Sequence, residues 1–189
     1  MCSMTPGYAA LRKGRRSMPG HAYLVTFATR QRRPHFANQV VAFDACRWLA
    51  ADAAWRDAKL LAWILMPDHW HGILQLEASA DLAESIGAAK GRVARGIRAK
   101  YPHLGGVWQD GFHDQIIRGE HHLRQAARYI VMNPVRAGLV KRVGDYPYWD
   151  AMWLSAPIGN EVGIRSIGAE APPTRAAQGS LPGSLEHRG

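Results

Sequence analysis

The sequence predicts an α+β domain of the ferredoxin-like type, a split βαβ sandwich. Segments rich in β-branched and aromatic residues alternate with segments of helical hydrophobic spacing, in the order strand, helix, strand, strand, helix, strand. That order is typical of the ferredoxin-like sandwich, and 189 residues suffice for one domain with its own core. We therefore expect a four-stranded antiparallel sheet with helices on one face, plus a C-terminal helix that carries Tyr129. The other face of the sheet is expected to be free for a nucleic acid.

The first four elements follow from residue type and spacing. Residues 22–29 are β-branched and aromatic, which favours a strand. Residues 36–57 place apolar side chains near helical spacing, which favours a helix. Residues 59–65 and 69–76 are predicted strands joined by a tight turn at 66–68, where proline presets its own φ and aspartate suits a turn.

The second half of the domain repeats the pattern. Residues 81–100 favour a helix, although each of its three glycines weakens that prediction by about 1 kcal/mol. Residues 107–118 are predicted to form the fourth strand with its lead-in. Residues 120–132 favour a helix whose first turn holds a glutamate, which suits the positive N-terminal end. A short helical turn is expected after Pro134.

The two ends of the chain differ from the middle in composition. Residues 1–19 are basic and turn-rich and are expected to form a flexible arm, residues 20–153 form the domain, and residues 154–189, rich in Gly, Pro, Ser and Ala, are expected to be a disordered tail. The two cysteines, Cys2 and Cys46, make no disulfide framework, which fits a reducing compartment. Since no apolar run reaches the length of a membrane span, we expect a cytoplasmic, nucleoid-associated protein with no membrane partner.

The formal charge of +9 makes a polyanion the favoured partner. Basic residues recur at three-residue spacing within 81–100 and form a stripe on one side of the predicted helix. The stripe could contact DNA, or it could simply be a solvated helix face. Few acids accompany the stripe, which favours contact with phosphates. The candidate DNA-binding residues there are Arg92, Arg95, Arg98 and Lys100, with Lys90 beside them. Further candidates are Arg30, Arg32 and Arg33 in a basic loop, and Trp108, whose indole could stack on an unpaired base.

His69 and His71 are the most informative pair of residues. In a strand, side chains at i and i+2 point to the same face, roughly 6.5–7 Å apart along the backbone, and Trp70 between them faces the opposite way. Burying two unpaired imidazoles would be costly. A metal ion, a carboxylate or the nucleic acid is therefore expected to occupy them.

Tyr129 lies on a predicted helix with polar neighbours. Gln125, Tyr129, Asn133 and Arg136 share one helix face at i, i+4, i+8 and i+11. An amide there could complete a metal site, and an arginine could hold a phosphate. Asn133 has a second interpretation, because Asn followed by Pro134 is also a common N-cap and helix start. A tyrosine that only packs is the alternative for Tyr129.

Three motifs carry a resemblance to a known family. They are Met66-Pro-Asp-His-Trp-His-Gly-Ile-Leu74, Gly106-Val-Trp-Gln-Asp-Gly-Phe-His-Asp-Gln-Ile-Ile-Arg118 and Tyr129-Ile-Val-Met-Asn-Pro-Val-Arg-Ala-Gly-Leu-Val140. In this order and spacing the chain resembles the REP-associated tyrosine transposases of the single-tyrosine HUH superfamily. The resemblance covers roughly residues 22–149, and Asp68 departs from it because asparagine is common at that place.

The resemblance implies a nuclease that acts on single-stranded DNA beside palindromic hairpins. It implies that His69 and His71 hold Mg²⁺ or Mn²⁺ with Asn133 as third ligand, and that Tyr129 is the nucleophile. It further implies a 5′-phosphotyrosine intermediate and no nucleotide cofactor, in a monomer or homodimer. Possible accessory residues are Gln125, His113 and His122, with Arg128 and Arg136 as further DNA contacts.

Two rival functions remain beside this transposase-like enzyme. The first is a domesticated hairpin- or repeat-binding protein whose cleavage is weak or dispensable. The second is a metallohydrolase that uses an activated water, which predicts activity without Tyr129. The chain lacks an obvious carboxylate base near the histidine pair, which disfavours the second rival.

Overall fold

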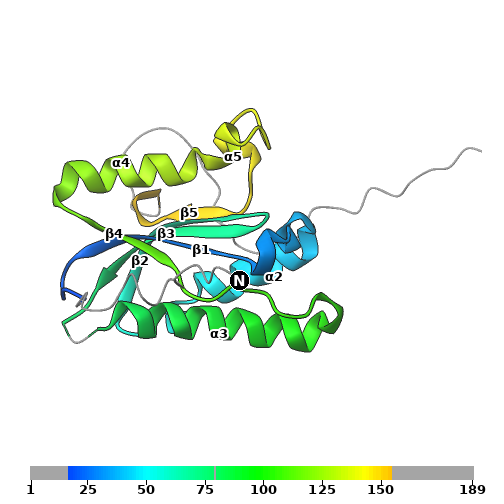
Figure 1. Cartoon of the computed structure of the whole chain (residues 1–189). Coiled ribbons are helices and arrows are strands. Elements are labelled where there is room, and N and C mark those ends of the chain that lie inside the picture. Colours follow the sequence, from blue (N-terminus) through cyan, green and yellow to red (C-terminus); the bar gives the residue numbers. More distant parts are fainter. Residues whose placement is uncertain (1–16, 79, 155–189) are drawn as a thin grey trace, which may run out of the picture.

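The computed structural model describes residues 17–78 and 80–154, which form a five-stranded antiparallel sheet with helices on both faces (Figure 1). The strand order is β4-β1-β3-β2-β5. The strands are β1 (Ala22–Ala28), β2 (Ala58–Met66), β3 (His69–Leu76), β4 (His113–Ile117) and β5 (Trp149–Ala151). The helices are α2 (Gln39–Ala50), α3 (Leu82–Lys100), α4 (Gly119–Val131) and α5 (Asn133–Arg136). Short 3₁₀ turns lie at Arg30–Arg32, His35–Ala37, Asp52–Ala54, Pro102–Leu104, Val143–Asp145 and Met152–Leu154.

Helices α2 and α3 cover one face of the sheet. Asn38 and Asp81 cap them, because each side chain accepts hydrogen bonds from two backbone N–H groups of the first turn. Alternate strand residues point into this core, among them Trp70, which stacks on Phe27 and on Trp55 with ring centroids 4.7 and 5.0 Å apart. Cys46 lies buried in α2, and burial raises the pKa of its thiol.

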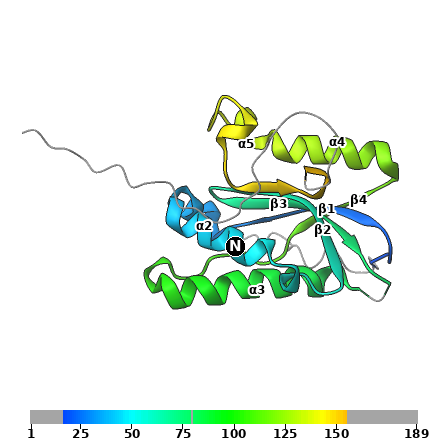
Figure 2. The same cartoon turned by 180° about the vertical axis from the view of Figure 1, so that it is seen from behind.

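Helix α4 covers part of the opposite face (Figures 1 and 2). Ala127 and Ile130 are buried there with Ile64, Met66 and Ile73 of the two central strands. The expectation that this face is free was therefore wrong. The predicted helix carries an apolar stripe on one side, and burying that stripe on the sheet removes it from water.

The α+β fold class is confirmed, with differences at several elements. The sheet has a fifth strand, β5, which pairs with β2 and is held there by Tyr146, whose hydroxyl donates to the Leu65 carbonyl at 2.7 Å. The helix predicted over 36–57 is shorter because Asn38 starts α2. Only 113–117 of the segment 107–118 is a strand.

The expected domain limits are only partly covered by the structure. Residues 1–16 and 155–189, and with them most of the expected arm and tail and Cys2, lie outside the described residues. Within the described part of the chain, we find no helix with the length and apolar character needed to cross a bilayer.

Candidate active site

The two histidines project from β3 toward the face that α4 covers. In the register of the sheet, His69 is opposite Met66 and His71 is opposite Ile64. Both of these partners belong to the core under α4, whereas Trp70 belongs to the core under α2 and α3. The imidazole centroids are 4.6 Å apart, so the strand alternation predicted from the sequence brings the two rings together.

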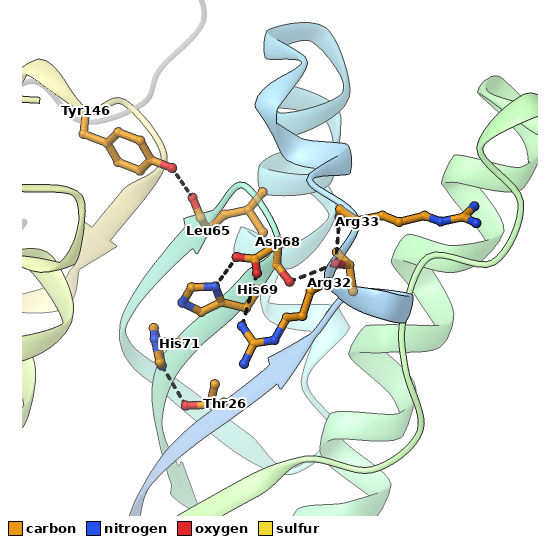
Figure 3. Close-up of polar contacts among 9 residues, drawn as sticks. Thr26, Arg32, Arg33, Leu65, Asp68, His69, His71 and Tyr146 are labelled. Carbon is orange, nitrogen blue, oxygen red and sulfur yellow. Dashed lines mark hydrogen bonds and ion pairs between the residues drawn. The ribbon is translucent and has the colours of Figure 1, made fainter. Parts of the chain in front are cut away.

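Each imidazole is held through its Nδ1 atom (Figure 3). His69 Nδ1 lies 2.5 Å from Asp68 Oδ1, and His71 Nδ1 lies 2.6 Å from the hydroxyl of Thr26 on the neighbouring strand. An ionised carboxylate can only accept a hydrogen bond, so His69 Nδ1 is the donor. In the neutral ring this leaves Nε2 with the lone pair that can bind a cation.

The surroundings of the histidine pair lower the pKa values of both Asp68 and His71. Burial raises the pKa of Asp68, but hydrogen bonds and charge interactions with His69 and Arg32 outweigh burial and keep that pKa below its usual range. Burial, with smaller effects from His69 and Arg32, lowers the pKa of His71 to about 3. His71 is therefore neutral at physiological pH, the form that can ligate a metal.

The basic loop after β1 packs on the turn that precedes His69. The backbone N–H of Thr29 donates to the Asp68 carbonyl at 2.8 Å, and Arg32 reaches Asp68 Oδ2 at 3.2 Å. Arg33 points away from this contact (Figure 3), and Arg30 is fixed by a backbone bond to Val107 at 2.8 Å. Sequence reasoning treated these arginines as DNA contacts and Asp68 as a turn residue; it missed that Arg32 and Asp68 pair beside the histidines.

Tyr129 lies on the flank of α4 that faces β1 and β4. Ala127 and Ile130 point into the sheet, while His122 and Gln125 line a groove beside β1 and β4. Tyr129 follows Gln125 by one turn and so lies on the same flank. Helix α4 starts next to the end of β4 and runs back along the sheet (Figure 1). Tyr129, near the end of α4, therefore lies toward the end of the sheet where β1 ends and β4 begins, opposite the histidines. Its side chain is 46% exposed, which leaves it accessible to a substrate.

Asn133 begins α5 directly after α4. Its side chain makes no capping hydrogen bond to α5, so the N-cap interpretation was wrong. Instead, Asn133 Nδ2 donates to the Ile130 carbonyl at 3.1 Å, which satisfies one carbonyl at the end of α4. This bond leaves the amide oxygen, the ligand atom a cation needs, uncommitted to that contact.

Arg136 and Arg128, the two arginines predicted near Tyr129, differ in their position relative to the tyrosine ring. The guanidinium carbon of Arg136 lies 4.4 Å from the centroid of the Tyr129 ring, a cation–π contact. Arg128, by helical spacing, projects from the side of α4 away from the groove.

The residues present fit a divalent cation. The donors are two imidazole Nε2 atoms, each ring being oriented through Nδ1, as ligating histidines usually are. In residues 17–78 and 80–154, no group of three or more His, Cys, Asp or Glu side chains could hold a metal. The role of the Asn133 amide oxygen as a third donor stays a prediction. Imidazole donors suit Mn²⁺ better than Mg²⁺, which prefers oxygen.

Several predicted DNA contacts lie on the far layer, around α3. Arg95 and Arg98 are exposed there and Arg92 is half-buried. Helix α3 lies on the opposite side of the sheet from α4 (Figure 2). Lys100 is paired with Asp44 at 2.6 Å. Lys90 donates to the carbonyls of Gln109 and Gly111, both at 2.8 Å. Both lysines thus make contacts within the fold, and the DNA contact predicted for Lys100 stays a prediction.

Trp108 is half-buried, and part of its ring packs against the core. Its ring contacts Phe27 edge-on at 4.9 Å and Phe36 at 5.3 Å between centroids, and its indole nitrogen is buried. Stacking of Trp108 on an unpaired base stays a prediction. His113 lies on β4 in register with Thr26, in the same row as His71.

A solved structure resembles this protein in fold. The fold resembles a solved structure of a REP-associated tyrosine transposase bound to a REP hairpin, with a TM-score of 0.61 and 24% identity over 90% of this chain and 97% of that one. The fold of this chain thus has a solved counterpart.

The sequence comparisons identify the family. The family model described as "Transposase IS200 like" matches residues 17–133, and the chain belongs to this family. A REP-associated tyrosine transposase of Escherichia coli (strain K12) is 32% identical over 96 residues, which are 49% of this chain and 54% of the relative. A second relative, from Haemophilus influenzae, is 34% identical over 95 residues, 44% of this chain and 53% of its own length. The chain thus spans about half the length of the curated relatives it matches.

Proposed function

We propose that this protein cleaves and rejoins single-stranded DNA beside hairpin repeats, with Tyr129 as the nucleophile and a divalent cation at His69 and His71. The observation that carries the proposal is the shared side of the sheet: the histidine pair lies on the face that α4 covers, and Tyr129 is exposed on α4. Family membership and the name of the E. coli relative support it.

In the covalent step, the Tyr129 oxygen forms a bond to the scissile phosphorus and the bond from phosphorus to the 3′-oxygen breaks. The phenol gives up its proton and the departing 3′-oxygen takes one up, so no proton is gained or lost overall. The products are a 5′-phosphotyrosine and a free 3′-hydroxyl. Attack by a 3′-hydroxyl reverses the step and rejoins the strand, so phosphodiester energy is conserved without a nucleotide cofactor.

The side chains around this step have separable roles. Neutral His71, oriented by Thr26, and His69, oriented by Asp68, would hold the cation. The Asn133 amide oxygen would be the third ligand. When bound, Mg²⁺ or Mn²⁺ would act as a Lewis acid on the phosphate oxygens. Arg136, at the ring of Tyr129, places a positive charge where the phosphate joins the tyrosine.

The test mixes the purified protein with labelled hairpin oligonucleotides that copy palindromic repeats of its own genome, in Mn²⁺, Mg²⁺ or EDTA, on a denaturing gel. We expect a metal-dependent protein–DNA adduct that is absent in Tyr129→Phe and His69→Ala. Tyr148→Phe, which removes a hydroxyl from a half-buried tyrosine near the sheet edge, is the matched control and should keep the adduct.

The rival functions give different results in the same assay. Cleavage that persists in Tyr129→Phe would mean that water is the nucleophile. Tight hairpin binding with no adduct in either metal would support a domesticated hairpin-binding protein and would refute the enzymatic proposal.

A further inference from the structure

The turn before His69 is clamped by the loop that follows β1. The backbone N–H and the hydroxyl of Thr29 both donate to the Asp68 carbonyl, at 2.8 and 2.9 Å. The N–H of Phe36 donates to the carbonyl of Pro67 at 3.0 Å. Thr29 is fully buried, so water does not compete for these bonds. The contacts fix the backbone at Asp68, and with it the point from which the carboxylate reaches His69.

The clamping loop has a strained backbone at two residues. Gln31 and Arg32 have φ values of 58° and 55°, in the left-handed region that residues with a Cβ rarely adopt. Such a conformation persists only where the surroundings hold it, and it often marks a functional contact. Here it lets Arg32 reach Asp68 Oδ2 at 3.2 Å, while Asp68 Oδ1 lies 2.5 Å from His69 Nδ1 (Figure 3). Each carboxylate oxygen therefore has its own partner.

The two histidines have unequal partners. His69 Nδ1 donates to a carboxylate, whereas His71 Nδ1 contacts the neutral hydroxyl of Thr26 at 2.6 Å. A carboxylate on the far nitrogen of a ligating imidazole fixes the tautomer and raises the basicity of the nitrogen that binds the metal. A hydrogen bond to a charged acceptor is also about twice as strong as one between neutral groups. An asparagine in place of Asp68 would offer a similar oxygen without the charge.

We propose that Asp68 is a positioning residue whose negative charge makes His69 the stronger of the two histidine ligands. The inference rests on the proposed function, because it takes His69 and His71 as ligands of a divalent cation. It adds that the affinity for the cation is set by a side chain that acts through the His69 imidazole.

The first test measures Mn²⁺ affinity without DNA, from the electron paramagnetic resonance signal of the free ion. Asp68→Ala should weaken binding by about 10- to 100-fold, the usual effect of losing such a partner. Asp68→Asn keeps an oxygen in the same place but removes the charge, and should weaken binding about tenfold. Thr26→Val, which removes the neutral partner of His71, should weaken binding less than Asp68→Ala.

The second test reads the proton on His69 directly, in metal-free protein, by ¹⁵N NMR of the imidazole nitrogens. In the wild type the proton of neutral His69 should be on Nδ1, because the carboxylate accepts it there. Asp68→Ala should move this proton toward Nε2 and leave the His71 nitrogens unchanged. A role of Asp68 in the turn alone would not produce this change.

Two arginine variants serve as matched controls. Arg32→Gln breaks the ion pair with Asp68, and Arg33→Gln removes an equally exposed charge that points away from it (Figure 3). Both should bind Mn²⁺ within about fivefold of the wild type, because exposed ion pairs contribute little and the carboxylate stays at His69.

The inference is overturned if Asp68→Asn binds Mn²⁺ as tightly as the wild type, or if Arg32→Gln weakens binding as much as Asp68→Ala does. Mn²⁺ binding that does not fall in His69→Ala would overturn the metal site of the proposed function as well. A failure confined to the Asp68 variants leaves the proposed function standing, and adduct formation tests that function separately.

Discussion

The contact between Asp68 and His69 shows how one residue acquires a role that its position in the chain does not reveal. In the sequence Asp68 is a turn residue after Pro67. In the structure its carboxylate accepts from His69 and pairs with Arg32, which arrives from a loop 36 residues earlier. The histidine pair could be predicted from strand alternation, but this long-range partner could not.

The low pKa of His71 predicts how stability depends on pH. In the unfolded chain the group titrates near 6.5, and in the folded protein near 3. Between these values only the unfolded state binds the extra proton, so the free energy of unfolding falls as pH drops from 6.5 toward 3. We expect a loss of about 2–3 kcal/mol between pH 7 and 4.5, measured by urea unfolding in EDTA.

The His71→Gln variant isolates this contribution. It removes the titrating group, so its stability should change less over the same pH interval. Burial, with help from Arg33, also lowers the pKa of His35, which adds a loss of the same sign in both proteins. Asp68 and Asp44, whose pKa values are lowered, contribute only at more acidic pH. Equal pH dependence in His71→Gln and the wild type would contradict the assignment.

At the scale of the elements, the β2–β3 hairpin depends on a glycine beneath a tryptophan. A Cβ at Gly72 would lie 2.0 Å from the Trp70 ring, which is itself fixed between Phe27 and Trp55. Gly72→Ala should therefore destabilise the protein by about 1–3 kcal/mol through overpacking, measured by chemical denaturation.

Gly87 supplies the matched control in helix α3. A Cβ there meets no atom within 4 Å, so Gly87→Ala should raise stability by up to about 1 kcal/mol through helix propensity. Two glycine-to-alanine changes of opposite sign are the expected result. A neutral or stabilising Gly72→Ala would show that the Trp70 ring is not fixed as described.

The elements that the sequence predicted well are those with a strong local pattern. Strands β1 and β3 and helices α3 and α4 follow from alternation, spacing and caps. Segment 107–112 has strand-forming residues, yet Gly105 and Gly111 adopt positive φ and Lys90 holds the loop from α3. Strand β5 is three residues long, and its pairing with β2 is a tertiary contact without a local signal.

At the scale of the whole molecule, the basic stripe on α3 and the candidate active site lie on opposite layers (Figures 1 and 2). The three-residue spacing of the arginines predicted the stripe. It could not predict on which side of the sheet the stripe lies, because that depends on the packing of α3 and α4 on opposite faces. A DNA that contacts both must reach around an edge of the sheet.

This separation predicts that the stripe contributes binding rather than chemistry. The double variant Arg95→Gln with Arg98→Gln should reduce the salt slope of hairpin binding by about two units, since each phosphate contact contributes about 0.9. The rate of adduct formation at saturating DNA should be unchanged. A control with Arg124→Gln and Arg142→Gln removes two arginines that are paired with acids, and should change the slope by less than one unit. An unchanged slope in the Arg95 and Arg98 variant would exclude the stripe as a DNA contact.

We propose that Tyr129 lies beside the metal site of the histidine pair, in one active site, and Mn²⁺ relaxation tests this directly. Protein labelled with 3-fluorotyrosine is titrated with Mn²⁺ and followed by ¹⁹F NMR, with the Tyr129 resonance assigned from Tyr129→Phe. We predict that Mn²⁺ broadens this resonance strongly, that Tyr101, bonded to Asp44 beside α3, broadens least, and that His69→Ala abolishes the effect. A Tyr129 resonance that stays sharp at saturating Mn²⁺ would contradict the account.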